Sequence, residues 1–530
     1  MRLKFHLKRW RNVYALTTFI ALFAAFTLTN FVGTTAATAP STSQQWVVAF
    51  HQNSSLPANV DRMVAAAGGT IIARMPEIGG IAVSSDNPNF GSAIKGNSQV
   101  KAADVATEMH LIDPGVQDQP STDSADNNGG NFSPAGPDPQ PGTEPLYNQQ
   151  WDKMRMNASA TGSYAVQQGR RDVTIAILDT GADAFHPDIA PNLDTARSIS
   201  FVPSEPTFQD FNGHGTWCMS AVAAPINAFG ISGVAPNVTV VSEKVLNMNG
   251  SGQFFWLDLA LIYAGLQHFD VASMSLSGII PKCGDNSPNG CDHTDYILLQ
   301  RSVQFARSNG VLPIASLGNN NFNLSDGDFF RYYIVAPAEV AGVVGVGATG
   351  YYNQKAFYSS YGMGKTDVTA PGGSTRNYTG VPGSGAPPPP YFGIGRVLGA
   401  WSTTGTATGF PDPNLGVEQC TGVGNTPPCY PYAWVQGTSM ACPNTAGVAA
   451  LIVSQYGDFT PNNKNKLHMS PTQVETILQT TANNQPCPEP RTVVAGPGIN
   501  PPIATCHGDV GYNDFFGKGI VDALKAVTFH

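Results

Sequence analysis

The chain has 530 residues, which exceeds one typical domain and predicts a large unit with accessory segments. Charged residues make up only 12% of it and the formal net charge is −9, a balance that argues against nucleic-acid binding. The 42% of hydrophobic residues can still form a large core, while 56 Gly and 41 Pro predict many loops and turns.

The N-terminus has the order of charges and apolar residues that is typical of a secretory signal peptide. Met1–Tyr14 is basic, Ala15–Val32 carries no charge, and small residues follow up to Ala39. An uncleaved membrane anchor over Val13–Val32 is the alternative, because that stretch is about long enough to cross a bilayer. Threonines and Asn30 make the stretch less apolar, so we expect residues 1–39 to be a cleaved signal and the protein to be secreted.

Residues 44–111 predict a small α/β unit. Strand patterns occupy Trp46–Phe50, Gly69–Met75 and Gly79–Ser85, and a short helical pattern occupies Asn59–Gly68. Residues 112–145 are rich in Pro, Gly, Ser and Asp, which predicts a linker that proteases can reach. A small unit on a cuttable tether behind a signal peptide indicates a propeptide.

Residues 146–530 alternate apolar runs with helical patterns, which predicts a parallel α/β sheet. The expected strands are Val173–Leu178, Val238–Leu246, Val271–Leu276, Val311–Ser316 and Val343–Ala348, and the expected helices are Asp258–Phe269 and Thr294–Gly310. Gly372–Tyr432 is a long insertion rich in Gly and Pro.

Six of the eight cysteines fall in loops rich in Pro, Gly and Asn, and export permits disulfides. Pairing near neighbours gives Cys283/Cys291, Cys420/Cys429 and Cys487/Cys506, although spacing alone does not determine connectivity. Cys218 and Cys442 lie instead inside helical runs of small residues. They are either buried free thiols, which we favour, or one bridge between two helices.

Three short motifs carry groups suited to catalysis. Asp179 follows the strand pattern Val173–Leu178, and the carboxyl ends of parallel strands form the ligand crevice of such sheets. His214 lies between two glycines that permit close backbone approach, and Ser439 opens a helix whose free N–H groups favour negative charge. Taken singly they could be a turn aspartate, an ordinary histidine and a capping serine. Together they supply the acid, base and nucleophile of a general-base triad.

The motifs occur in the order found in one protease family. DTG at Asp179–Gly181, HGT at His214–Thr216 and GTSMA at Gly437–Ala441 resemble the signatures of the subtilisin-like serine proteases, or subtilases. Supporting matches run from about Tyr147 to the C-terminus, and the segment before residue 112 resembles the family's inhibitor I9-like prodomain. The resemblance implies a subtilisin-like α/β fold, with a mostly parallel central sheet, helices on both faces and a small ferredoxin-like prodomain.

The resemblance also implies a role for each site residue. Asp179 would orient the imidazole, His214 would act as general base and then acid, and Ser439 would be the nucleophile. Asn319 would donate to the oxyanion, unless it is an ordinary loop asparagine. Substrate would bind as an extended strand between two edges, made by Gly250, Ser251 and Gly252 and by Ser275, Leu276, Ser277 and Gly278. Ser277 and Leu317 stand where the family commonly has Gly and Ala, so its broad apolar preference is not transferred.

The chemistry requires no cofactor, but the resemblance points to structural calcium. Asp188 and Asn227 match positions that supply calcium ligands in some family members, and their oxygens suit a hard cation. A turn aspartate and a loop asparagine are the alternative.

The sequence therefore predicts a secreted serine-type endopeptidase (EC 3.4.21.-), made as a self-processed preproprotein and acting as a monomer on polypeptide substrates. Its own prodomain would be a transient inhibitor, no nucleic acid would bind, and a membrane would be met only through the N-terminal signal. One rival is a non-catalytic peptide-binding module on the same scaffold. Another is an esterase or a dedicated processing peptidase.

Overall fold

The computed structural model describes residues 43–111, 144–282, 293–327, 329–375, 395–405, 416–422, 426–460, 463–494 and 503–530. The expected signal peptide, nearly all of the linker 112–145 and the pair Cys283/Cys291 lie outside the described residues. Gln44–His530 forms one unit by its contacts. Within the described ranges, no helix combines the length and the apolarity that crossing a membrane would require.

The N-terminal part of this unit is an antiparallel sheet of four strands in the order β2-β3-β1-β4. The strands are β1 (Gln44–Phe50), β2 (Gly69–Met75), β3 (Gly80–Ser85) and β4 (Val100–Val105), and the helices are α1 (Val60–Ala66) and α2 (Phe90–Lys95). Both helices pack on one side of the sheet through a core that includes Trp46, Phe50 and Phe90. The expected strands and helix of this part are therefore present.

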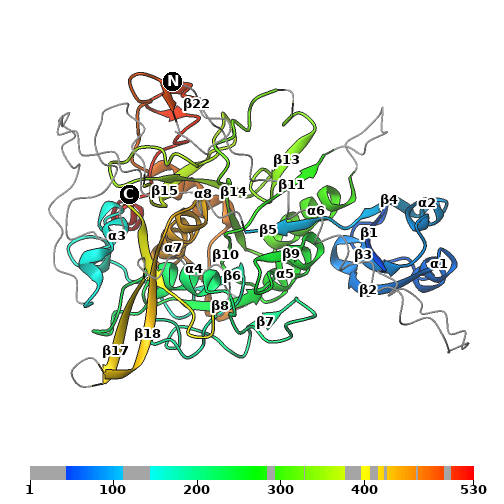
Figure 1. The fold of residues 1–530 in the computed structure, drawn as a ribbon, viewed down its shortest axis with the longest axis horizontal. Coiled ribbons are helices and arrows are strands. Elements are labelled where there is room, and N and C mark those ends of the chain that lie inside the picture. Colours follow the sequence, from blue (N-terminus) through cyan, green and yellow to red (C-terminus); the bar gives the residue numbers. More distant parts are fainter. Residues whose placement is uncertain are drawn as a thin grey trace, which may run out of the picture. The chain divides into compact units, whose positions relative to one another are not determined.

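The main sheet has seven strands in the order β15-β14-β12-β10-β6-β8-β7, and all neighbouring strands are parallel (Figure 1). They are β6 (Thr174–Asp179), β7 (Ile199–Ser200), β8 (Thr239–Lys244), β10 (Val271–Met274), β12 (Leu312–Ser316), β14 (Val344–Thr349) and β15 (Val368–Pro371). The five strands expected from the sequence are confirmed. β7 and β15 were not expected as strands, because one has two residues and the other four.

Helices cover both faces of the main sheet, because successive side chains of a buried strand point to opposite sides. In β6, Ile175 and Ile177 join the core under α4 (His214–Ala223), α7 (Thr438–Tyr456) and α8 (Pro471–Thr480). Ala176 and Leu178 join the core under α5 (Phe254–Leu266) and α6 (Thr294–Ser308). The predicted subtilisin-like arrangement, with helices on both faces of a parallel sheet, is confirmed.

Two expected helices differ slightly from the structure. α6 begins at Thr294 as predicted, and its end lies two residues before Gly310, which has a φ of +94°. α5 begins at Phe254 rather than at the expected Asp258. Its first turn is apolar and carries no capping side chain that would have marked the start.

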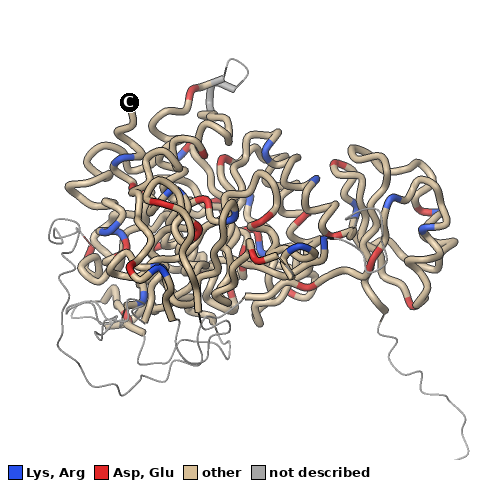
Figure 2. Tube along the Cα trace, turned by 90° about the horizontal axis from the view of Figure 1, so that it is seen from above, with Lys and Arg blue, Asp and Glu red and all other residues tan. Residues whose placement is uncertain are grey.

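Smaller elements surround the main sheet. The expected insertion includes a three-stranded sheet in the order β16-β18-β17, in which Cys420 faces Cys429. The remaining elements are β5 (Glu108–His110), α3 (Trp151–Arg155), β9 (Ser251–Gln253), β11 (Gly278–Pro281), β13 (Tyr333–Ala336), β16 (Val397–Ala400), β17 (Gly416–Gly422), β18 (Thr426–Val435), β19 (Asp458–Thr460), β20 (Asn463–His468), β21 (Thr492–Val494), β22 (Ile503–Thr505), β23 (Gly508–Asp509), β24 (Tyr512–Asn513) and α9 (Ala523–Val527). Figure 2 shows charged residues of both signs intermixed along the described chain.

The structure describes six of the eight cysteines, as two disulfides and two free thiols. Cys420–Cys429 and Cys487–Cys506 are disulfides, which agrees with the pairing of near neighbours. Cys218 and Cys442 are both free and buried, so the expectation of two free thiols is confirmed.

Candidate active site

Asp179 and His214 meet at the carboxyl end of the main sheet. Asp179 is the last residue of β6 and His214 is the first residue of α4. Asp179 Oδ1 lies 2.7 Å from His214 Nδ1, and the two side chains are 1% and 13% exposed. Because an ionised carboxylate can only accept, Nδ1 carries the proton and Nε2 is the basic nitrogen. The contact is the one expected of a carboxylate that orients a basic imidazole.

Ser439 lies in the first turn of α7, beside the same end of the sheet. Its hydroxyl donates to the carbonyl of Ser275 at 3.2 Å, and the Ser275 hydroxyl donates to the Ser439 carbonyl at 2.8 Å. Pro443 is the sixth residue of α7, so its missing N–H leaves the Ser439 carbonyl, four residues earlier, without its intrahelical donor. These reciprocal bonds hold the start of α7 against the residue that follows β10.

The Cys218 thiol lies between the histidine and the start of α7. Cys218 Sγ is 3.8 Å from His214 Nδ1 and 3.7 Å from the carbonyl oxygen of Ser439. Burial, and secondarily the Asp179 carboxylate, raise the pKa of this thiol well above its usual value. A neutral, buried thiol therefore bridges the elements that carry His214 and Ser439.

Asn319 lies beside the N-terminus of α7, after β12. Its Oδ1 accepts from Thr438 N at 2.9 Å and from Thr438 Oγ1 at 2.8 Å. The preceding Gly318 has a φ of +93°, and its N–H donates to Thr438 Oγ1 at 3.2 Å. Because the amide oxygen is directed at Thr438, Nδ2 is the donor end of the side chain. The structure thus places the expected asparagine next to the expected serine.

The two expected substrate-binding edges lie on either side of one segment of this chain. β5 (Glu108–His110) pairs antiparallel with β9, with Met109 opposite Gly252 and His110 opposite Ser251. The Leu111 N–H donates to the Gly250 carbonyl at 2.8 Å. The sequence did not predict that this particular segment would occupy the cleft.

On its other side, the same segment meets the edge that begins at Ser275. The His110 N–H donates to the Ser277 carbonyl at 3.3 Å, and the two residues form an antiparallel bridge. Met109 is 0% exposed and belongs to the apolar cluster that contains Leu276 and Phe254. Gly278 begins β11, and a Cβ added to it would lie 3.4 Å from the Glu108 carbonyl oxygen.

One of the two residues expected at a calcium site, Asp188, is a buried carboxylate. Asp188 is 0% exposed, and its Oδ2 accepts from Ile231 N at 3.1 Å and from Tyr432 Oη at 2.7 Å. Its Oδ1 is buried without a hydrogen-bond partner among the described residues. Burial raises the pKa of Asp188 to about 8, and the nearby Glu144 carboxylate adds to this effect.

Glu144 was missed from the sequence, because it was counted as part of the linker. It is 4% exposed, and its Oε1 accepts from the Asn227 N–H at 2.8 Å. The Asn227 side-chain oxygen accepts from Phe229 N at 3.0 Å, so its other lone pair is the one suited to a ligand. Carboxylate and amide oxygens are the ligand types that calcium takes, and Glu144 connects Asn227, through its N–H, with the neighbourhood of Asp188.

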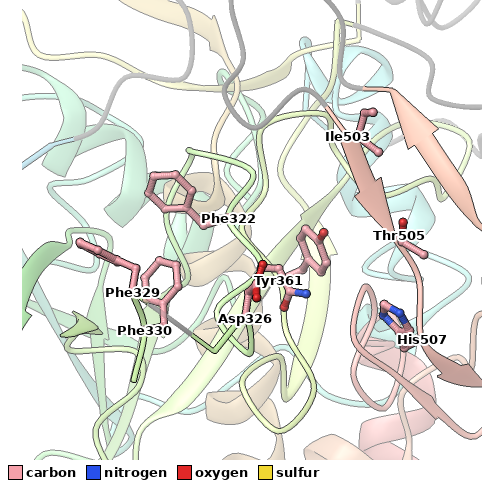
Figure 3. Close-up of a pocket in the computed structure, with 9 residues that line it drawn as sticks. Phe322, Asp326, Phe329, Phe330, Tyr361, Ile503, Thr505 and His507 are labelled. Carbon is pink, nitrogen blue, oxygen red and sulfur yellow. The ribbon is translucent and has the colours of Figure 1, made fainter. Parts of the chain in front are cut away.

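A separate cavity of about 570 Å³ lies between the loop that follows Asn319 and the hairpin β21–β22 (Figure 3). Its lining is mainly aromatic, with Phe322, Phe329, Phe330 and Tyr361 on one side and Ile503, Thr505 and His507 on the other. None of the expected catalytic, substrate-binding or metal residues lines it.

Comparison with known proteins identifies the family. The family model described as "Subtilase family" matches residues 170–519. The chain belongs to the subtilase family. The matched range contains the Asp179, His214 and Ser439 motifs but not the segment that pairs with β9.

Curated relatives match this subtilase over about half of its length. An alkaline protease from Alkalihalobacillus alcalophilus is 33% identical over 280 residues, which cover 53% of this chain and 53% of that protein. Subtilisin Savinase from Lederbergia lenta is 32% identical over 280 residues, which cover 53% of this chain and 76% of that protein. The chain thus spans about half the length of the first of these relatives.

Solved structures agree with the fold. The epidermin leader peptide processing serine protease of Staphylococcus aureus superposes with a TM-score of 0.63 at 20% identity, covering 92% of this subtilase and 98% of that chain. Fervidolysin from Fervidobacterium pennivorans gives a TM-score of 0.60 at 19% identity, covering 92% and 61%.

Proposed function

We propose that this subtilase is a secreted serine endopeptidase that cleaves peptide bonds through Asp179, His214 and Ser439. Membership of the family supports the reaction class, and the 2.7 Å contact between Asp179 and His214 supports their roles. The names of the curated relatives, an alkaline protease and subtilisins, point to the same activity.

In the proposed mechanism, Ser439 Oγ attacks the scissile carbonyl while His214 Nε2 takes its proton. Asp179 accepts from His214 Nδ1 and stabilises the imidazolium that forms. The oxyanion is met by the Ser439 N–H and Asn319 Nδ2, at the positive end of α7. His214 then protonates the leaving amine, and water hydrolyses the acyl-enzyme with His214 again acting as the base.

This mechanism needs the Ser439 hydroxyl to turn from the Ser275 carbonyl towards His214. Hydrogen bonds of catalytic groups commonly tighten only when substrate is bound. The backbone of Ser439 is already held by Ser275 and Cys218, so the proposed movement is one of the side chain.

The single observation that carries the proposal is the strand Glu108–His110 lying along β9. Main-chain pairing of this kind is how an extended peptide adds to an exposed sheet edge, with affinity from the backbone and selectivity from pockets. We infer that residues 44–111 are a prodomain, and that its C-terminal end blocks the cleft as a substrate would. Cutting of the following linker would then release the mature enzyme.

Contacts outside the cleft support the prodomain as an inhibitor of its own enzyme. Asp104 Oδ2 accepts from Thr294 N at 3.0 Å and from Thr294 Oγ1 at 2.6 Å, at the N-terminus of α6. The Thr107 N–H donates to Asp295 at 3.1 Å, and Arg301 donates to the Phe50 carbonyl at 3.0 Å. These bonds fix the N-terminal unit on α6 and so direct its last strand into the cleft.

We further propose that Asp188, Glu144 and Asn227 hold a structural calcium ion. The ion would neutralise the buried carboxylates and join the Glu144 segment to the loops of the protease part. It would supply stability and take no part in the chemistry.

The test compares the full wild-type chain with Ser439→Ala and with Ser454→Ala, which removes a buried hydroxyl from the same helix α7. Wild type and Ser454→Ala are expected to give a mature N-terminus by mass spectrometry and to label with a fluorophosphonate probe. Ser439→Ala should remain full length and unlabelled. Equal maturation of all three chains would overturn self-processing, and a matured wild type that does not label would overturn the catalytic role of Ser439.

A further inference from the structure

Asp210 is a buried carboxylate that accepts five hydrogen bonds around the catalytic pair. Its Oδ1 accepts from Thr180 Oγ1, Asn212 N and Gly213 N, each at 2.9 Å. Its Oδ2 accepts from Thr216 N at 2.9 Å and from Thr216 Oγ1 at 2.7 Å. The residue is 0% exposed and all of these donors are neutral. Only an ionised carboxylate can accept from every one of them, because a protonated acid or an amide brings hydrogens of its own.

These donors come from the two segments that carry Asp179 and His214. Thr180 follows Asp179 directly, and Gly213 immediately precedes His214. Thr180 Oγ1, while donating to Asp210, also accepts from the Gly215 N–H at 2.9 Å. Asp179 is therefore next to Thr180, whose hydroxyl bonds to the Asp210 carboxylate. His214 lies between Gly213, which bonds to the same carboxylate, and Gly215, which is connected to it through Thr180.

The carboxylate also satisfies the start of α4. The residue before His214 is a glycine with a φ of +116°, which has no side chain to cap the helix. The Thr216 N–H is one of the first amides of α4, which lack partners within the helix. Asp210, four residues before His214, accepts a hydrogen bond from this Thr216 N–H. Its carboxylate also places negative charge at the positive end of the helix. A glycine cap leaves room for Trp401, which a Cβ on Gly213 would meet at 2.1 Å.

The backbone of Asp210 is held as firmly as its side chain. Its carbonyl accepts from Ser402 Oγ at 2.6 Å and from Thr404 Oγ1 at 2.9 Å. Its N–H donates to the Ala182 carbonyl at 3.1 Å. The carboxylate is thus a fixed point on which two loops converge, and it is not a mobile side chain that happens to be buried.

We propose that Asp210 is the positioning residue of the active site, whose ionised carboxylate holds the Asp179 loop and the start of α4 in register. It acts through Thr180, Gly213 and Thr216, and touches neither the substrate nor the reacting atoms. This inference rests on the proposed peptidase function, in which the distance between Asp179 and His214 sets the orientation of the base.

The test measures kcat and KM of the matured enzyme on a peptide substrate, with Asp210→Asn as the variant. The amide would turn its N–H groups towards at least one pair of donors, so the two loops should separate slightly. A displacement of about 1 Å in such a site lowers the reaction rate by about 10²-fold. We expect kcat to fall by about that factor while KM stays within about 2-fold.

Asp270→Asn is the matched control. Asp270 is also buried and accepts from Thr174 N at 2.8 Å, at the opposite end of the strand that Asp179 closes. Asp270→Asn should lower the stability of the protein as Asp210→Asn does, because each variant removes a buried carboxylate that accepts hydrogen bonds. Its kcat should stay within about 2-fold of the wild-type value. The far-downfield proton resonance of His214 Nδ1 should shift in Asp210→Asn and remain unchanged in Asp270→Asn.

A double-mutant cycle tests the route through Thr180. Thr180→Val should lower kcat by about 10-fold in wild type and have much less effect in the Asp210→Asn background, since coupled residues are not additive. If Asp210→Asn does not accumulate as folded protein, Thr180→Val alone decides, and an unchanged kcat overturns the inference. An inactive wild type would instead overturn the proposed function, whereas an active wild type with an equally active Asp210→Asn overturns only the role of Asp210.

Discussion

The thiol of Cys218 lies 3.8 Å from Nδ1 of His214, on the side of the imidazole that faces Asp179. Cys442 is not bonded to it, although both thiols belong to the same core cluster, and its Sγ lies 3.6 Å from Ser273 Oγ. Burial raises the pKa of Cys442 to about 11, so neither sulfur exists as a reactive thiolate at neutral pH.

Native enzyme should therefore react slowly with iodoacetamide at pH 8 and rapidly once unfolded, as counted by mass spectrometry. Where Cys218 does react, activity should fall in proportion, because the adduct has no room beside His214. Cys218→Ala should be active and insensitive to the reagent, and Cys442→Ala serves as the control that keeps the sensitivity. Rapid labelling of both thiols without loss of activity would contradict this prediction.

Asn319→Ala should lower kcat by about 10²–10³-fold with little change in KM, because the proposed role of the amide is to stabilise the oxyanion and not to hold bound substrate. Asn323→Ala is the control, since Asn323 lies in the same loop and its Oδ1 accepts from the exposed Ser325 N–H at 3.1 Å. Steady-state kinetics on one peptide substrate separates the two. A loss confined to KM would assign Asn319 to substrate binding.

Met109→Lys should weaken the binding of the proposed prodomain along β9. Met109 is 0% exposed, and loss of its apolar burial is worth about 10-fold or more in affinity. The full chain carrying Met109→Lys should therefore release active enzyme sooner than wild type in a time course of peptide hydrolysis. Ile72→Lys, at a position 45% exposed on β2, should follow the wild-type course. Identical courses for all three chains would show that β5 does not control release.

Chelation of calcium should lower the thermal stability of the protein. EDTA is expected to reduce the Tm of the Ser439→Ala chain by several degrees, since a bound ion stabilises only the folded state. Asp188→Asn and Glu144→Gln should have a lower Tm from the start and respond little to EDTA. Asp194→Asn, which alters a carboxylate bonded to Arg197 on the surface, should respond as the parent does. A full EDTA response in Asp188→Asn would place the ion elsewhere.

Glu243 should make stability fall as pH rises. It is 0% exposed, both carboxylate oxygens lack hydrogen-bond partners among the described residues, and burial raises its pKa well above the usual 4.5. Between the unfolded and folded pKa values the native state binds more protons, so stability decreases with pH from about 4.5 upwards. Glu243→Met should remove this slope and add about 1–3 kcal/mol at pH 8.

Urea unfolding of the Ser439→Ala chain at several pH values measures this effect without self-digestion. Glu418→Met, which changes an exposed glutamate, should leave the slope as it was. A slope that survives Glu243→Met would have to come from another group.

Much of the fold and the identity of the proposed triad could be predicted from the sequence. Short apolar runs such as Val173–Leu178 have the length of a buried strand and are too short for a typical helix, so a strand follows from the local pattern. Asp179, His214 and Ser439 were found because each is embedded in a short motif with its own turn and helix start. The disulfides Cys420–Cys429 and Cys487–Cys506 were predicted because short loops bring near neighbours together.

Other features depend on contacts between residues far apart in the chain, which no local pattern records. Glu144 bonds to Asn227 and comes near Asp188 only after the chain folds. Glu108–His110 pairs with β9, which lies about 140 residues later in the printed sequence. Asp210 reads as an ordinary loop aspartate until Thr180 and Thr216 converge on it. Sequence determined which groups this protein can use, since periodicity and turn chemistry act over a few residues. Tertiary structure decided how they are held, because burial of a charge is stable only where distant donors gather around it.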